Sequence, residues 1–195
     1  MEELKRIVEA LLFASSDPLS VRRIKTIVPG LETQQVLDAL SELKEDYAEG
    51  TRSFQIVEVG GGYQLTTKPD YSLWVGKLIE SRALQRLSRA ALETLAIVAY
   101  KQPVVRSTIE SIRGVNVDGV LRTLMERNLV RIVGRAEGPG RPLLFGTTRD
   151  FLMQFGLSKL SDLPGTEEIE ELIGQKVEAK ADPASEADAD QDETQ

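Results

Sequence analysis

An internal repeat constrains the fold of this chain more than any other feature of its sequence. The segment at 11–27 aligns without a gap with the segment at 96–112. The matched pairs are Leu12 with Ile97, Ala14 with Ala99, Pro18 with Pro103, Ile24 with Ile109 and Ile27 with Ile112. Each copy later reaches a glycine-rich turn and a stretch that ends in Thr-Thr. We therefore expect two copies of one unit of roughly 80 residues.

Each copy begins with a predicted pair of helices. The first helix of the first copy has the i, i+3, i+4, i+7, i+8 spacing of a buried face, at Leu4, Ile7, Val8, Leu11 and Leu12. In the second copy Ser88 is a suitable N-cap, and the predicted apolar face is Leu92, Leu95, Ala96 and Ala99. A proline turn and a short second helix follow in both copies. These second helices carry Ile24 and Ile27, or Ile109 and Ile112.

A third helix and a β-ribbon complete each predicted unit. The third helix starts at Thr33 and ends before Gly50 in the first copy, and it runs from near Asn116 to Asn128 in the second. Strands are expected at 54–59, 63–67, 129–134 and 142–148, with Gly60-Gly61-Gly62 as a hairpin turn. Three helices and a ribbon make a winged helix, a variant of helix-turn-helix. The predicted class is mostly α with small β-ribbons (α+β).

The predicted domain organisation is two tandem winged helices and a tail. The boundaries are 1–80 for the first domain, 81–87 for a linker and 86–165 for the second domain. Residues 84–160 contain 12 basic and 6 acidic side chains, whereas 161–195 contain 2 basic and 12 acidic ones. From 175 to 195 Val177 is the sole large apolar residue, so we expect a disordered acidic tail. That tail is either a solvating segment or an electrostatic contact for a partner.

The residue inventory argues against an enzyme. The chain has no cysteine and no histidine, which removes thiolate chemistry, the usual neutral-pH base and the usual zinc ligands. No spacing of Asp and Glu marks a catalytic pair, and we expect neither a metal nor a cofactor. The N-terminus opens with two glutamates and lacks a long apolar run, so we expect a cytoplasmic protein without a membrane contact.

DNA binding is the first activity to weigh for a winged helix. The second copy is basic, and Arg131, Arg135 and Arg141 on its ribbon suit non-specific phosphate contact. Asp118 lies in the first turn of the third helix, where it suits the helix dipole and opposes base reading. The third helix of the first copy is acidic on its outer face. We expect weak non-specific DNA contact at most, with a sequence-reading transcription regulator as the alternative.

Several motifs of the chain resemble those of segregation and condensation protein B, the ScpB family. The motifs are AYKQP at 99–103, RGVN at 113–116, DGVLRTL at 118–124, GRPLLFGTT at 140–148 and FGL at 155–157. The opening EALLFASSDPLS is also of that type. The resemblance covers about 1–165, with Val117 standing where the family pattern has a small polar residue.

This resemblance implies a function in chromosome condensation and segregation during cell division. Proteins of this family form homodimers, mainly through the N-terminal winged helix, and bind the kleisin ScpA. ScpA bridges the heads of an SMC ATPase dimer, so the ATPase belongs to that partner. The resemblance thus implies a non-catalytic subunit of the SMC–ScpA–ScpB complex, associated with the nucleoid.

Kleisin binding requires apolar grooves on the winged helices. The apolar candidates lie near the proline turn and in the last strand: Val104, Val105, Ile112, Val115, Leu143, Leu144 and Phe145. Arg113 and Arg122 are candidates for charges that frame such a groove. Ordinary core packing is the competing explanation for each of these residues.

Overall fold

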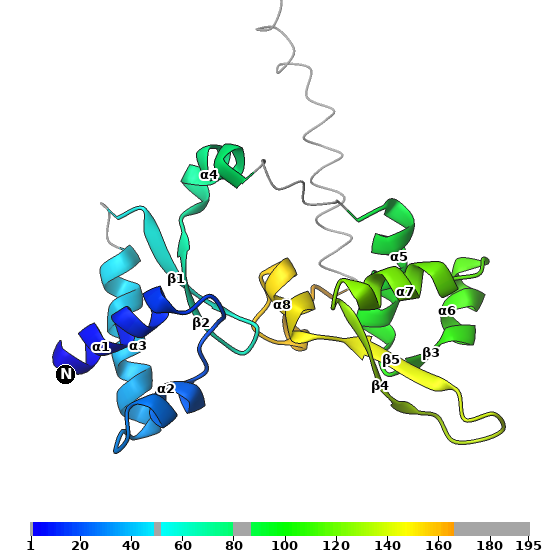
Figure 1. The fold of residues 1–195 in the computed structure, drawn as a ribbon, viewed down its shortest axis with the longest axis horizontal. Coiled ribbons are helices and arrows are strands. Elements are labelled where there is room, and N and C mark those ends of the chain that lie inside the picture. The colour runs from blue at the N-terminus through cyan, green and yellow to red at the C-terminus, as the bar shows by residue number, and fades with distance from the viewer. Residues whose placement is uncertain (1, 49–51, 80–86, 166–195) are drawn as a thin grey trace, which may run out of the picture. The chain divides into compact units, whose positions relative to one another are not determined.

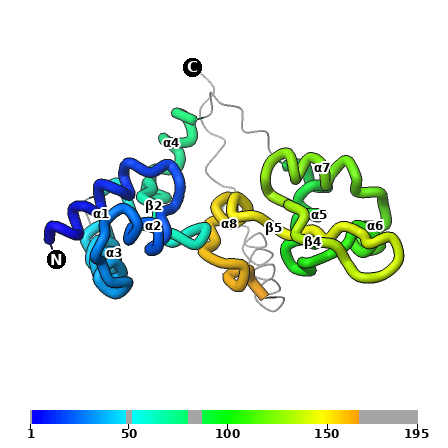
Figure 2. The backbone as a smooth tube through the Cα atoms, turned by 60° about the horizontal axis from the view of Figure 1, so that its bottom comes forward, coloured from blue at the N-terminus to red at the C-terminus, as the bar shows by residue number. Residues whose placement is uncertain are grey.

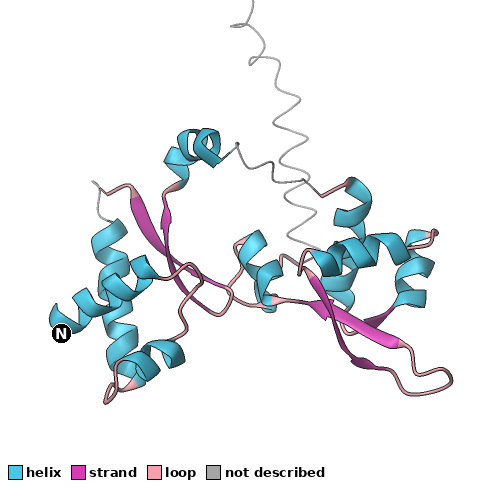
Figure 3. Cartoon of the chain, viewed as in Figure 1, coloured by secondary structure: helices cyan, strands magenta, loops and turns pink. Residues whose placement is uncertain are grey.

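The computed structural model describes residues 2–48, 52–79 and 87–165. Their order of elements is three helices and a ribbon, then a short helix, then three more helices and a second ribbon (Figure 1). Helices dominate and the strands form two small antiparallel sheets (Figure 3), which confirms the predicted class. The predicted linker, 81–87, lies outside the described residues except for Leu87, and the predicted tail, 175–195, lies entirely outside them. The predicted domain boundaries stay predictions.

The first three helices bury one face each. They are α1 (Glu2–Ala14), α2 (Val21–Ile27) and α3 (Thr33–Ala48), and Figure 2 traces α1 and α2 alongside α3. Their shared core contains Val8, Leu12, Ile24, Val36, Leu40 and Leu43. Two predicted core positions are wrong, because Ile7 is 36% exposed and Ile27 is 41% exposed. The buried stripe of α1 is therefore narrower than its pattern of apolar residues.

The first ribbon consists of β1 (Phe54–Val59) and β2 (Gly62–Thr67). Gly60 and Gly61 form its turn with φ of +57° and +71°, the two positive values that a type I′ hairpin requires. Tyr63 also exchanges two backbone hydrogen bonds with Leu19, at 2.8 and 2.9 Å. The turn after α1 is thereby tied to the ribbon as a one-residue extension of the sheet.

A short apolar helix follows this ribbon. The 3-10 turn Pro69–Tyr71 leads into α4 (Ser72–Ile79), a sequence rich in large apolar side chains. None of the α4 residues is buried. Helix α4 therefore adds no residue to the core beside it.

The second set of helices forms a separate core. It comprises α5 (Arg89–Lys101), α6 (Arg106–Arg113) and α7 (Asp118–Glu126). The buried residues include Leu95, Val98, Ala99, Ile109, Leu121 and Leu124. Ser88 caps α5 as predicted, since its hydroxyl accepts from the Ala91 amide at 3.2 Å. The prediction was wrong for Leu92, Ala96 and Ile112, which are exposed, so the buried face of α5 is rotated toward Val98.

Helix α7 ends as the sequence predicts. Asn128 has φ +55°, and its amide donates to the Met125 carbonyl at 2.9 Å. The Leu129 amide donates to the Leu124 carbonyl at 2.9 Å. This pair of bonds is the Schellman pattern, with Asn128 as the left-handed residue. At the other end the Asn116 side chain accepts from the Asp118 amide at 3.0 Å, close to the predicted start.

The second sheet has three strands in the order β3-β5-β4. They are β3 (Val104–Val105), β4 (Val130–Arg135) and β5 (Leu143–Thr147). A bulge interrupts the pairing of β4 with β5 between Ile132 and Gly134. Strand β3 follows the proline turn just as Leu19 does in the first set, so the repeat seen in the sequence extends to the strand pairing.

Helix α8 (Arg149–Phe155) follows β5 directly and was not predicted. The Thr148 hydroxyl caps it by accepting from the Phe151 amide at 3.1 Å. Gly156 ends it with φ +68°, and a short 3-10 turn, Leu160–Asp162, lies beyond. Among the described helices none has the length and apolar character needed to cross a membrane.

Candidate partner-binding surfaces

The proline turn of the second set is held against β5 by Gln102. Its side-chain amide donates to the Ala99 carbonyl at 3.0 Å and to the Thr147 hydroxyl at 2.9 Å. Its side-chain oxygen accepts from the Thr147 backbone amide at 2.8 Å. A Cβ on Gly146 would lie 2.9 Å from that oxygen, so this close contact requires glycine. The AYKQP and GRPLLFGTT motifs thus meet in one junction.

A hollow of about 380 Å³ opens beside this junction. Its lining contains Gln102, Pro103, Val133 and Leu144. Of these only Leu144 was a predicted site residue; Pro103 and Gln102 were visible only as part of a motif. Val133 lies on β4 and is 41% exposed. Its outward position depends on how β4 pairs with β5, including the bulge between Ile132 and Gly134, which the sequence alone does not reveal.

The predicted apolar site residues divide into three groups. Val104 and Phe145 face each other across β3 and β5 and are 4% and 6% exposed, so they belong to the core. Val105, Leu143 and Leu144 are half-buried on the same sheet. Ile112 and Val115 are 53% and 55% exposed. Of the predicted residues, a partner can therefore reach the exposed and half-buried ones, and Leu144 among them also lines the hollow.

Arg113 lies between helices and has little contact with solvent. Its guanidinium donates to the Ala90 carbonyl at 2.8 Å and to the Thr94 hydroxyl at 3.0 Å, and it lies 3.2 Å from a Glu93 carboxylate oxygen. The side chain is 14% exposed. Arg113 therefore joins the end of α6 to the start of α5, and its charge is engaged within the fold.

The outer face of α7 carries charges that pair with each other. Arg122 is 79% exposed along its side chain and reaches Glu126 at 2.9 Å. Asp118 forms an ion pair with Arg106, whose hydrogen bond holds the pKa of the Asp118 carboxyl below its ordinary value. The same contact raises the pKa of Arg106. A helix face on which acidic groups already hold the arginines offers little to a DNA base edge.

The ribbon arginines are exposed and make only local contacts. Arg131 donates to the Thr147 carbonyl at 3.4 Å, and Arg135 donates to the Arg141 carbonyl at 3.1 Å. Arg141 has φ +39° at the tip of the loop between β4 and β5. These arginines follow one ribbon and its tip, a placement that suits phosphate contact better than sequence reading.

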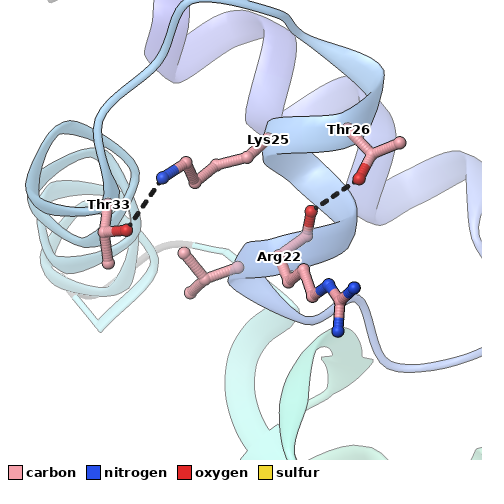
Figure 4. Close-up of a pocket in the computed structure, with 5 residues that line it drawn as sticks. Arg22, Lys25, Thr26 and Thr33 are labelled. Atoms are coloured by element: carbon pink, nitrogen blue, oxygen red, sulfur yellow. Dashed lines mark hydrogen bonds between the residues drawn. The ribbon is translucent and has the colours of Figure 1, made fainter.

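The first set of helices has a basic hollow of about 440 Å³ that the sequence analysis missed. It is lined by Val21, Arg22, Lys25, Thr26 and Thr33 (Figure 4). The Lys25 ammonium donates to the Thr33 hydroxyl at 3.0 Å, and the Thr26 hydroxyl donates to the Arg22 carbonyl at 2.9 Å. The Lys25 ammonium and the Thr26 hydroxyl are therefore each engaged within the hollow. Within the described residues no cluster of acidic side chains could hold a metal ion.

Exposed apolar side chains are concentrated on α4 and at the end of α1. Leu73, Trp74 and Leu78 are 62%, 65% and 79% exposed, and Phe13 is 78% exposed. The Lys77 ammonium lies over the Trp74 ring, 5.2 Å from its centre, although the Trp74 side chain stays 65% exposed. Large apolar side chains gathered on one short helix are typical of an interaction surface.

Comparison with known proteins identifies the family. The model of the segregation and condensation complex subunit ScpB matches residues 6–166. Segregation and condensation protein B of Syntrophotalea carbinolica is 49% identical over 170 residues, which cover 87% of this chain and 85% of that protein. Crystallised ScpB of Mycobacterium tuberculosis is 35% identical, with a TM-score of 0.38, over 80% of this chain and 96% of that one. A dimer of an ScpB N-terminal domain complexed with an ScpA peptide is 35% identical, with a TM-score of 0.37, over 40% of this chain and 95% of that one. The chain belongs to the family of segregation and condensation complex subunit ScpB.

Proposed function

We propose that this chain self-associates through its N-terminal module, residues 1–80, and binds the kleisin ScpA through its C-terminal module, residues 86–165. The observation that carries the proposal is the family match over residues 6–166. The chain is thus a non-catalytic subunit for chromosome segregation and condensation. Its SMC ATPase partner is reached through ScpA, and it works in the cytoplasm on the nucleoid.

Helix α4 supports the proposed self-association. Its apolar side chains are exposed although the helix is fully formed, and burying a large apolar side chain stabilises an interface by about 1.5–3 kcal/mol. Phe13 adds a further exposed ring to the same module. A second copy offers a surface of the same chemistry, as a two-fold symmetric dimer requires.

The hollow beside the Gln102 junction supports the proposed ScpA contact. Val133 and Leu144 supply apolar lining, and Gln102, which also lines the hollow, fixes the proline turn through its bond from the Thr147 amide. An amphipathic helix or an extended segment binds such a groove through regularly spaced apolar anchors. Exposed Ile112 and Val115 lie on the same module and extend the apolar surface available to a partner.

DNA contact is proposed only as a weak additional property. Arg131, Arg135 and Arg141 supply positive charge on one ribbon and its loop, whereas Asp118 of α7 is engaged with Arg106 of α6. Such contact is independent of sequence and weakens steeply with added salt. A sequence-specific regulator has no supporting contact among the described residues.

Two variants separate the proposed surfaces. Trp74→Ser with Leu78→Ser is expected to raise the dimer dissociation constant at least about tenfold, measured by sedimentation equilibrium. Val133→Asp is expected to weaken ScpA binding, measured by fluorescence anisotropy of a labelled ScpA middle segment, without changing self-association. Glu45→Ser on the exposed face of α3 is the matched control for both.

Trp74 also provides a direct readout because it is the sole tryptophan of the chain. Its emission is expected to shift to shorter wavelength as protein concentration rises and α4 becomes buried. Emission that stays constant from nanomolar to micromolar protein, with unchanged self-association of the double variant, would rule out α4 as the dimer surface. Unchanged ScpA affinity of Val133→Asp would rule out the hollow.

A further inference from the structure

The tip of the first ribbon contacts a segment almost a hundred residues away in the sequence. Figure 1 shows α8 beside the turn between β1 and β2. The Gly60 amide donates to the Leu157 carbonyl at 2.8 Å, and the Gly61 amide donates to the Ser158 carbonyl at 2.9 Å. The Ser158 hydroxyl donates to Glu58 at 3.0 Å. These contacts lie within one compact unit that extends from Met1 to Leu160.

Arg149 reinforces this contact from the first turn of α8. Its Nε donates to the Gly60 carbonyl at 2.7 Å, and its Nη2 donates to the Pro18 carbonyl at 2.5 Å. The planar guanidinium can hold two carbonyls at once, and its charge strengthens both bonds. One side chain thus engages both the turn after α1 and the tip of the ribbon, although it stays partly exposed to solvent.

The glycines of the ribbon tip are explained by this packing. A Cβ on Gly60 would lie 2.9 Å from Met153 Cγ, whereas a Cβ on Gly61 would meet no atom within 4 Å. Gly60 is buried and Gly61 is exposed. Both have positive φ, so the difference between them is the close approach of α8 at Gly60.

The FGL motif shapes the other side of the contact. Gly156 takes φ +68°, and the Leu157 amide donates back to the Leu152 carbonyl at 2.8 Å, which closes α8 in a Schellman turn. The closed turn leaves the Leu157 carbonyl free to accept from Gly60. At its start α8 is tied to the second module, because the Thr148 hydroxyl donates to the Asn128 carbonyl.

We propose that residues 148–158 act as a strap that couples the two winged-helix modules, with Arg149 and Gly60 as the residues that fix it. The strap is anchored at Asn128 by Thr148 and at the ribbon tip by Arg149, Leu157 and Ser158. This coupling does not depend on the partner proposed above. A partner that separates the ribbon tip from α8 must break the bonds of the Gly60 and Gly61 amides to Leu157 and Ser158.

Hydrogen exchange of single amides tests the strap in the full chain. In Arg149→Ala the Gly60 and Gly61 amides are expected to exchange at least about tenfold faster than in the parent protein. The Tyr63 amide, which donates to Leu19 within the first module, is the internal reference and is expected to keep its rate. Arg149→Lys keeps the positive charge but lacks the planar guanidinium that binds two carbonyls at once, so the Gly60 and Gly61 amides are expected to exchange at an intermediate rate.

Distances between the modules provide a second readout. The chain has no cysteine, so Glu45→Cys with Ser107→Cys places two spin labels on exposed sites without background. We expect one narrow distribution of the distance between the two labels in the parent protein. Gly60→Ala should broaden this distribution, and the matched variant Gly61→Ala should leave it unchanged. Dilution with unlabelled protein restricts the measured distances to labels within one chain. Unchanged exchange at Gly60 and Gly61 in Arg149→Ala would overturn the strap. A distribution equally broad in the parent and in Gly60→Ala would overturn it too.

Discussion

Replacing Arg113 tests whether this residue serves the fold or the partner. The sequence makes it a candidate charge framing a partner groove, but in the structure its guanidinium binds the Ala90 carbonyl and the Thr94 hydroxyl inside the helix packing. Thr94 is fully buried. The Arg113→Ala variant should therefore lose stability as its primary effect.

The contacts set the expected magnitude. A hydrogen bond from a charged donor contributes about 1.5–3 kcal/mol net. The Ala90 carbonyl keeps its bond from the Thr94 hydroxyl, so it is not left unsatisfied in the variant. Glu93 is about half exposed, and its ion pair with Arg113 adds at most about 1 kcal/mol. The expected loss is about 2–3 kcal/mol, or a decrease in Tm of about 5–10 °C for a chain of this size.

Urea unfolding followed by circular dichroism measures this loss. Arg122→Ala is the matched control, because that arginine is exposed and its Glu126 pair contributes only about 0.2–0.5 kcal/mol. Arg113→Lys should retain part of the stability but not the forked contact. If Arg113→Ala were as stable as Arg122→Ala to within about 0.5 kcal/mol, while its ScpA affinity fell, the assignment of Arg113 to the fold would be refuted.

Two further predictions concern the first module. Gly62→Ala places a Cβ 2.8 Å from the Leu19 backbone and should lower the free energy of unfolding in urea by about 1–3 kcal/mol. Gly76→Ala on α4, where the Cβ meets no atom within 4 Å, is the control and should be neutral or stabilising. Equal effects of the two substitutions would contradict the packing argument. Burial, and then the hydrogen bond to Glu9, raises the pKa of Tyr47 above its ordinary value. The neutral Tyr47 phenol therefore contributes fully to the free energy of unfolding below about pH 10, and this contribution is lost as pH rises through the raised pKa. Tyr47→Phe should flatten the alkaline fall of the urea midpoint, and an unchanged slope would count against it.

Local signals in the sequence predict the helices and ribbons well. Ser88 caps α5 and Asn128 closes α7 because a hydroxyl acceptor and a tolerance of positive φ are properties of the residue itself. The turn at Gly60 and Gly61 follows from the same reasoning. Gapless alignment of the two copies also anticipates that Leu19 and β3 occupy equivalent places, although neither was expected to pair as a strand.

Tertiary context decides what the sequence left open. The repeat matches Ile27 with Ile112, but both are exposed, whereas Ile24 and Ile109 are fully buried, so only one side of each short helix faces the core. Strand β3 is too short to recognise by alternation. Arg113 looked like a surface charge because its acceptors on α5 lie about twenty residues away along the chain.

The mass of the complex with the middle segment of ScpA tests the central claim most directly. Light scattering after gel filtration reports this mass for the purified full chain mixed with that segment. A stable complex that contains two copies of this chain and the ScpA segment is the predicted result. A chain that stays monomeric and elutes apart from ScpA at micromolar concentrations would contradict the account.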